Sequence, residues 1–109
     1  MTETTTAPEA GVKPGKPSPG QPVPWNVVLL DDDHHSYEYV IEMMQRLFHR
    51  SPQAGMLVAR EVDSRGRAVC MTTHKELAEL KRDQIHAFGK DVRIPACGGG
   101  MTAVIEPAQ

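Results

Sequence analysis

Apolar residues recur along this chain with two periods, that of a β-strand and that of an α-helix, and they predict segments of both kinds. A β-rich run over residues 25–30 ends in three consecutive aspartates, and a helix-like pattern begins behind Ser36, a good capping residue. The helix is expected to end near Arg50, with apolar residues on one face and charged residues on the other. The apolar stripe consists of Tyr37, Val40, Ile41, Met44, Leu47 and Phe48. We therefore expect acids at the junction between a strand and an amphipathic helix.

A second helix is predicted directly after the first. Ser51 suits a helix cap, and Pro52 suits the first helical turn. Apolar residues continue at helical spacing as far as Val62, and the polar run over residues 63–66 is typical of a turn. We therefore expect this helix to end near Val62.

The last third of the chain indicates a strand, a helix and a final strand. Residues 67–71 and 101–106 carry the two strand patterns. Thr73 and Glu76 have the spacing of a capping box for a third helix, which Gly89 ends. Its apolar stripe is Leu77, Leu80, Ile85 and Phe88. The order strand–helix–helix–strand–helix–strand predicts an α+β domain, with a small three-stranded antiparallel sheet and three helices packed on one face.

Composition divides the chain into two parts. Residues 1–24 hold most of the prolines, several glycines and repeated threonines, and no aromatic residue. Such a segment buries too little apolar surface to offset the entropy of ordering it. We therefore expect a disordered extension over residues 1–24 and one folded domain over residues 25–109. The extension lacks the continuous apolar run and the basic start of a signal peptide.

Charge and cysteine content argue against several classes of function. The net charge is −2 at pH 7, whereas a general nucleic-acid binder normally shows a basic face. No segment approaches the roughly 20 apolar residues of a membrane span. Cys70 and Cys97 lack metal-ligand spacing and are typical of buried thiols in a reducing compartment. We therefore expect a cytoplasmic monomer that needs no cofactor or metal and binds neither nucleic acid nor membrane.

The aspartates after the first strand are the main candidates for chemistry. Carboxylates at the end of a strand, just before a helix, can hold a metal, an amine or a guanidinium. Catalysis is not indicated, because the acids are consecutive on one loop, and no Ser–His–Asp or Cys–His arrangement accompanies them. His34 and His35 raise a metal hypothesis, but adjacent residues rarely face one ion.

One class of domain with this beginning is the response-regulator receiver, which also opens with an apolar strand, an acidic pair and an amphipathic helix. A receiver alternates strand and helix five times, and the chain after these acids is too short for that. A receiver also needs an aspartate at the end of a central strand, whereas Asp63 follows a helical pattern. A degenerate receiver would require magnesium at Asp31 and Asp32 and another aspartate to accept phosphate.

Over residues 25–107 the chain resembles the ClpS family of adaptors for ATP-dependent Clp proteases. The resemblance lies in an apolar strand followed by acids at 27–33, and in the helical patterns at 37–42 and 47–48. It continues at 66–70 and 78–81 without a gap. The resemblance implies an α+β adaptor that docks on the N-terminal domain of a ClpA- or ClpC-like AAA+ unfoldase and performs no chemistry itself.

The resemblance also implies a site for substrate N-termini with a bulky apolar first residue, as in the N-end rule. In the family, an apolar pocket takes the first side chain while polar groups hold the α-ammonium. Carried over by position, the resemblance implies that Asp31 and Asp32 bind the ammonium group. It also implies that the pocket wall is formed by His35, Tyr37, Val40, Ala59 and Val62. Because Tyr37 and Tyr39 alternate on their helix, only one of them can face the core, and we place Tyr37 on the pocket side.

Three positions depart from the family pattern. Asp63 stands where the family usually has a histidine that helps to hold the α-amino group, and Asp31 replaces the usual asparagine. Asp31, Asp32 and Asp63 are therefore expected to face one small volume and to favour a bound cation. Three readings stay open: binding of the α-ammonium, a preference for another cation (an N-terminal Arg or Lys, or a metal), or loss of the pocket. Ala59 replaces a bulkier residue, which predicts a wider pocket.

The resemblance assigns unfoldase docking to the third predicted helix. Glu76 and Lys81 occupy the positions of an acid and a lysine on the family's docking face. A simpler reading makes Glu76 part of a helix cap and leaves Lys81 solvated. We predict an adaptor that delivers substrates with N-terminal degrons to a Clp unfoldase for proteolysis. The alternatives are a docking module that modulates the ATPase without reading N-degrons, and the degenerate receiver domain.

Overall fold

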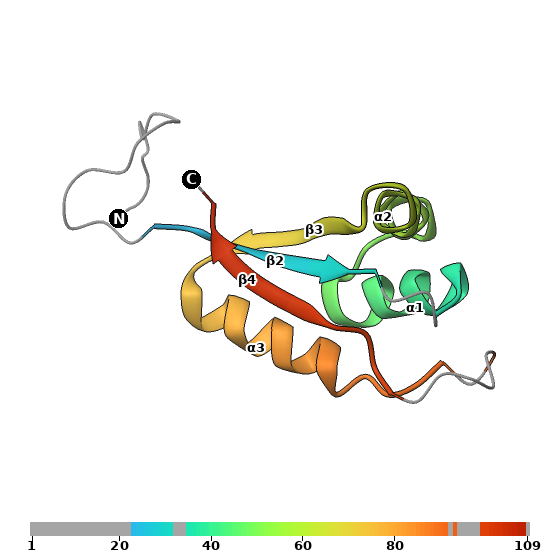
Figure 1. Cartoon of the computed structure of the whole chain (residues 1–109). Coiled ribbons are helices and arrows are strands. Elements are labelled where there is room, and N and C mark those ends of the chain that lie inside the picture. Colours follow the sequence, from blue (N-terminus) through green and yellow to red (C-terminus); the bar gives the residue numbers. More distant parts are fainter. Residues whose placement is uncertain (1–22, 32–34, 92, 94–98, 109) are drawn as a thin grey trace.

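A three-stranded antiparallel sheet with β2 (Trp25–Leu30) at its centre organises the domain (Figure 1). The computed structural model describes residues 23–31, 35–91, 93 and 99–108. The remaining elements are α1 (Tyr37–Phe48), α2 (Pro52–Arg65), β3 (Arg67–Thr73), α3 (Lys75–His86) and β4 (Ala103–Pro107). Their order and antiparallel pairing confirm the predicted α+β class. The extension predicted over residues 1–24 lies, apart from Val23 and Pro24, outside the described residues.

The pairing of β2 with both neighbours decides which side chains enter the core. The strand order is β3-β2-β4, and Val28 lies opposite Val69 on one side and Val104 on the other. Since side chains alternate along a strand, Val27 and Leu29 point to the opposite face, where they join the core. Val69 and Val104 are the more exposed members of the outer row. The helices therefore cover one face of the sheet, and on the other face Val69 and Val104 are partly exposed while the central Val28 is buried.

The three helices pack around the inner face of the sheet, the face that carries Val27 and Leu29. In Figure 1, α3 lies along the sheet, and α1 lies beyond the carboxyl end of β2. α2 packs against α1 and β3. A Cβ added at Gly55 would lie 3.1 Å from the Cα of Ile41, so glycine permits the close approach of α1 and α2. Residues from all three helices meet Val27 and Leu29 in one apolar cluster.

The buried side of α1 differs from the predicted stripe. Tyr39 and Met43, which the prediction left off the stripe, are 2% and 0% exposed. Ile41 and Leu47, which it included, are half-buried. Tyr39 can enter the core because its hydroxyl donates a hydrogen bond to the carbonyl of Gly89, so this polar group keeps a partner when the ring is buried. Met44 is fully buried as predicted.

The second helix is longer than its pattern indicated. The predicted turn over residues 63–66 is wrong, because Asp63 lies in the last helical turns and α2 ends at Arg65. Gly66 is the true terminator: it has a φ of 81°, and its N–H donates to the carbonyl of Val62. The start was predicted correctly, with Ser51 as the cap and Pro52 in the first turn. The extension places Asp63 on a helix rather than on a loop.

The predicted capping box of the third helix is also wrong. Thr73 pairs with Trp25 in the β2–β3 ladder, so it belongs to the strand and cannot cap the helix. The strand therefore runs two residues beyond its predicted end. His74 occupies the cap position and makes no capping hydrogen bond through its side chain. The helix ends at His86, before the predicted Gly89, which turns the chain with a φ of 99°.

The helical stripe facing the sheet is set by a small residue that the apolar pattern missed. Ala78 and Ile85 are fully buried, whereas Leu80 is 51% exposed. Alanine lets α3 lie close to the sheet, and it carries a weak hydrophobic signal in a sequence. The final strand runs over Ala103–Pro107 rather than over 101–106, because it keeps pairing with β2 as far as Trp25. No helix in the described part of the chain has the length and apolar character needed to cross a bilayer.

Candidate functional site

A cavity of about 180 Å³ lies where four segments meet beside the carboxyl end of β2. Asp31 follows β2, Tyr37 and Val40 come from the first turn of α1, and Val62 comes from the second half of α2. Met101, which precedes β4, also lines the cavity. The full lining consists of Asp31, His35, Ser36, Tyr37, Val40, Ala59, Val62, Asp63 and Met101. The site thus depends on the α1–α2 pair being held against the start of β4.

The floor of the cavity is apolar. Val40, Ala59, Val62 and Met101 are each no more than 4% exposed. Val40 is presented by α1, while Ala59 and Val62 lie nearly one turn apart on α2, so both helices contribute to one surface. Alanine at position 59 leaves space that a longer side chain would fill. Such a floor favours an apolar side chain over a polar one.

The mouth of the cavity is polar and carries carboxylates. The Tyr37 hydroxyl donates a 2.6 Å hydrogen bond to Oδ2 of Asp63, and this bond raises the pKa of the Tyr37 phenol. Asp31 lies at the same mouth, with its backbone N–H bonded to the carbonyl of Gly66. A carboxylate offers about four acceptor positions. Asp63 therefore has acceptor capacity left after its bond to Tyr37.

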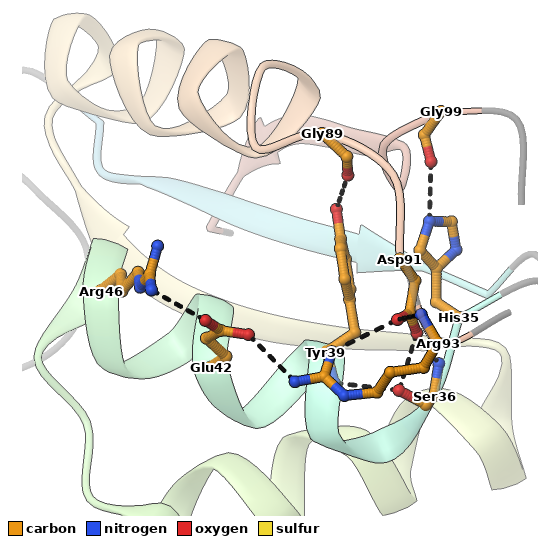
Figure 2. A network of polar contacts seen from close by, with 9 residues as sticks. All are labelled: His35, Ser36, Tyr39, Glu42, Arg46, Gly89, Asp91, Arg93 and Gly99. Carbon is orange, nitrogen blue, oxygen red and sulfur yellow. Dashed lines mark hydrogen bonds and ion pairs between the residues drawn. The ribbon is translucent and has the colours of Figure 1, made fainter.

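His35 forms the rim on the side of the last loop (Figure 2). Its Nε2 lies 2.9 Å from the carbonyl oxygen of Gly99, and its ring centroid lies 4.5 Å from that of Tyr39. The imidazole is thus fixed between a core aromatic ring and the backbone that leads into β4. This contact joins the start of α1 to the segment that carries Met101.

A buried carboxylate holds the start of α1 in place. Asp91 is 1% exposed, and its Oδ2 accepts hydrogen bonds of 2.7 Å from both the N–H and the hydroxyl of Ser36 (Figure 2). Its Oδ1 accepts a 3.0 Å bond from the N–H of Arg93. Burial by itself raises the pKa of Asp91, but the hydrogen bonds from Ser36 and Arg93 outweigh it and bring the pKa down to about 2. Asp91 is therefore a structural anion within hydrogen-bonding distance of a residue that lines the cavity.

Ion pairs extend this network along α1. Nη1 of Arg93 lies 3.3 Å from Asp91, and its Nη2 lies 3.3 Å from Glu42. Glu42 also pairs with Arg46 one turn later, at 2.9 Å. In Figure 2 these side chains line up along the same helix that carries Tyr39, whose hydroxyl reaches Gly89. The chain after α3 is therefore tied to α1 at several points, which fixes the rim made by His35 and Ser36.

The structure brings together most of the residues that the sequence placed in the substrate site. Seven of the eight line the cavity, namely Asp31, His35, Tyr37, Val40, Ala59, Val62 and Asp63, and the eighth, Asp32, lies outside the described residues. Sequence reasoning missed Ser36 and Met101. Ser36 carried a signal as the expected cap of α1, but Met101 carried none beyond its place at the start of a strand. The function of all eight residues stays a prediction.

The two predicted docking residues lie on α3, away from the cavity. Glu76 is exposed in the first turn. The ammonium of Lys81 donates a 2.6 Å hydrogen bond to the carbonyl of Leu47 and lies 5.5 Å from the ring centroid of Phe48. Lys81 therefore binds the carboxyl end of α1, as a cation near a helix C-terminus is expected to do.

The described residues bear on two expectations from the sequence, the hypothesis of a metal site near the acids and the burial of the cysteine thiols. Within residues 23–31, 35–91, 93 and 99–108, no group of three or more His, Cys, Asp or Glu is arranged to hold a metal ion. Asp32, Asp33, His34 and Cys97 lie outside this part of the chain. Cys70 is buried as predicted, and burial raises the pKa of its thiol to about 12, which makes it a poor nucleophile.

The fold and the cavity define a small α+β domain with a mainly polar pocket, which has buried apolar residues in its lining and carboxylates at its mouth. A family model described as ATP-dependent Clp protease adaptor protein ClpS matches residues 20–95. The chain therefore belongs to the ClpS family of Clp protease adaptors.

Individual relatives agree with this assignment. The chain is 32% identical over 79 residues to the ATP-dependent Clp protease adapter protein ClpS of Xanthomonas campestris pv. campestris strain 8004, covering 72% of this chain and 74% of the relative. The corresponding protein of Xanthomonas oryzae pv. oryzae strain MAFF 311018 is 29% identical over the same shares of the two chains. Among solved structures, Agrobacterium tumefaciens ClpS2 bound to L-phenylalaninamide is similar, with a TM-score of 0.70 and 26% identity. The similarity covers 80% of this chain and 99% of that chain.

Proposed function

We propose that this protein recognises the free N-terminus of a substrate polypeptide and delivers that substrate to a Clp-type AAA+ unfoldase. The cavity would take the first side chain, and the carboxylates at its mouth would hold the α-ammonium. The adaptor would act in the cytoplasm as a monomer, without catalysis. The observation that carries the proposal is the convergence of β2, α1, α2 and the start of β4 on one pocket with an apolar floor and an anionic mouth.

The two halves of the pocket suit the two halves of an N-terminal residue. Val40, Ala59, Val62 and Met101 offer a buried apolar surface to a bulky side chain. Asp31 and Asp63 offer acceptors to an ammonium, and hydrogen bonds to charged groups are stronger than neutral ones. The related ClpS2 was solved with L-phenylalaninamide, a compound with a free α-amino group and an aromatic side chain. That likeness supports the same chemistry here.

The replacement of a histidine by Asp63 is compatible with this function. Asp63 accepts a hydrogen bond from Tyr37, which fixes the carboxylate at the mouth before any ligand arrives. A fixed anion loses less side-chain entropy on binding an ammonium than a mobile one. We infer that Asp63 supports recognition of the α-amino group.

The choice of first residue is the sharpest test of the pocket. We expect peptides that differ only in their free first residue to bind in the order Phe, Tyr or Trp above Leu and Met, and all of these above Ala. Burying an aromatic ring in place of a methyl group should tighten binding by at least about tenfold. Fluorescence polarisation with labelled peptides measures this series directly.

Two other results would contradict the proposed pocket. A preference for Arg or Lys would mean that the carboxylates, and not the apolar floor, decide specificity. Equal and weak binding of every peptide would leave a docking module that does not read N-degrons. The matched control is the same series on Val62→Asp, in which a charge enters the floor and the aromatic preference should disappear.

Docking on the unfoldase is proposed for the exposed face of α3 around Glu76. Replacing Glu76 by lysine should weaken binding to the isolated N-terminal domain of a Clp unfoldase by about tenfold, because a charge is reversed at an interface. Lys81 is a poorer probe, since its loss would also free the carbonyl of Leu47 at the end of α1. Biolayer interferometry with immobilised adaptor measures the effect.

Glu61→Lys is the matched control for docking, because Glu61 is an exposed acid on α2. It should leave unfoldase binding within about twofold of the starting value. If the Glu76 and Glu61 variants bound the unfoldase domain with equal affinity, docking on α3 would be contradicted.

A further inference from the structure

A second concave surface lies beside the pocket, along the seam between α1 and α2. It has a volume of about 450 Å³ and consists of Ile41, Pro52, Gln53, Met56, Leu57 and Arg60. We call it the seam groove. Its lining is almost entirely apolar, and Leu57 leaves 65% of its surface exposed. Clustered apolar residues on a small domain indicate a binding surface more often than isolated ones do.

The seam groove continues the proposed substrate pocket along both helices. On α1, Tyr37 lines the pocket and Ile41, one turn later, lines the groove. On α2, Asp63 lines the pocket, and Arg60, nearly one turn earlier, lines the groove. The charge of Arg60 is close enough to act on the Tyr37 hydroxyl. The Tyr37–Asp63 hydrogen bond therefore lies about one helical turn from the groove on both helices.

The spacing along the helices suits an extended peptide that leaves the pocket. One helical turn advances about 5.4 Å, and an extended chain advances about 3.3 Å per residue. Ile41 lies one turn beyond Tyr37, and Met56 lies two turns before Asp63. A substrate whose first residue fills the pocket would thus pass over the groove with roughly its third to fifth residues.

We propose that the seam groove binds apolar side chains at about the third to fifth residues of the substrate's N-terminal segment. The inference rests on the proposed function of the pocket, and it names a second part of the recognised sequence. Ile41, Met56 and Leu57 supply the apolar contact surface. Arg60 stands at the edge as a hydrogen-bond donor for carbonyl groups of the peptide backbone. An adaptor of this kind reads a short segment instead of a single residue.

The test uses the full chain and two fluorescent peptides with a free N-terminal phenylalanine. One carries leucine at positions three to five, and the other carries serine there. We expect the leucine peptide to bind about tenfold more tightly, because two or three apolar side chains become partly buried. Leu57→Gln should reduce that preference to about threefold or less and leave the affinity for the serine peptide unchanged. Leu80→Gln is the matched control, since Leu80 is an exposed leucine on α3.

The possible outcomes separate this inference from the function on which it rests. Equal binding of the two peptides, or equal effects of the Leu57 and Leu80 variants, would contradict the proposed role of the seam groove. Neither result would contradict the proposed function of the pocket. Failure of both peptides to bind would overturn both. Sedimentation of the unliganded protein provides a further check, because a dimer that Leu57→Gln abolishes would assign the groove to a second copy of the chain and overturn the proposal.

Discussion

Replacing Asp91 by alanine is expected to lower the free energy of unfolding by about 3 kcal/mol, the largest stability effect that we predict outside the apolar core. Asp91 is 1% exposed and accepts hydrogen bonds from the N–H and the hydroxyl of Ser36. Removing it leaves the two partly buried donors of Ser36 without this acceptor, and it also removes the hydrogen bonds that Arg93 donates to the carboxylate. Urea denaturation followed by circular dichroism measures the loss.

The matched control is Asp83→Ala on α3. The Asp83 side chain is 64% exposed and pairs with its neighbour Arg82 at 3.1 Å. Its replacement should change the free energy of unfolding by less than about 0.5 kcal/mol. Similar losses for the two variants would show that the Asp91 network contributes no more than a surface ion pair.

The same carboxylate predicts how stability depends on pH. The pKa of Asp91 in the folded protein is lowered to about 2 from an ordinary value of 3.8. A lowered pKa means that the folded state holds the charged form more tightly, so the contribution is fully present above about pH 4 and is lost as pH falls toward 2. The lost contribution should be about 1–2 kcal/mol when solvent near the carboxylate is allowed for. Asp91→Asn should flatten this part of the pH profile.

Acetylating the α-amino group of a bound peptide is expected to weaken binding by about a hundredfold or more. The acetyl group removes a positive charge that would lie beside Asp31 and Asp63, and it also adds bulk at the mouth of the pocket. Hydrogen bonds to charged groups contribute about 1.5–3 kcal/mol each, so the loss of one or two accounts for the factor. Paired polarisation titrations of a free and an acetylated Phe peptide measure it.

Asp63→Asn isolates the charge from the shape of the mouth. This variant should bind the free peptide about tenfold less tightly and leave the weak binding of the acetylated peptide unchanged. Asp83→Asn is the control for a change of net charge far from the site. If both variants bound the free peptide with the same affinity, Asp63 would have no part in binding the ammonium group.

The sequence predicted the elements more reliably than their ends. Each strand and helix was found because its apolar period extends over several residues, and Ser36, Ser51 and Pro52 marked two helix starts correctly. One end failed because a distant partner decides it: Thr73 is held in β3 by Trp25, and no neighbouring residue shows that pairing. The end of α2 failed because a polar run over residues 63–66 is typical of a turn, whereas the helix continues through Asp63 until Gly66 turns the chain.

The site was predicted through family resemblance, and its supports were not predicted at all. Position in the family pattern placed seven residues that now line one cavity. Asp91 was not singled out, because nothing local shows that its carboxylate reaches Ser36 across 55 positions. Met101 was missed because an isolated methionine at a strand start has no recognisable pattern. Long-range contacts of this kind become visible only when the chain is folded.

The most direct test of the proposed recognition site is a titration of the labelled protein with L-phenylalaninamide, followed by amide chemical shifts in NMR. We expect saturable shifts concentrated at Tyr37, Val40, Ala59, Val62 and Met101, with few shifts on α3 and none of comparable size with N-acetyl-L-phenylalaninamide. Shifts that cluster elsewhere, or equal responses to the free and the acetylated compounds, would contradict it.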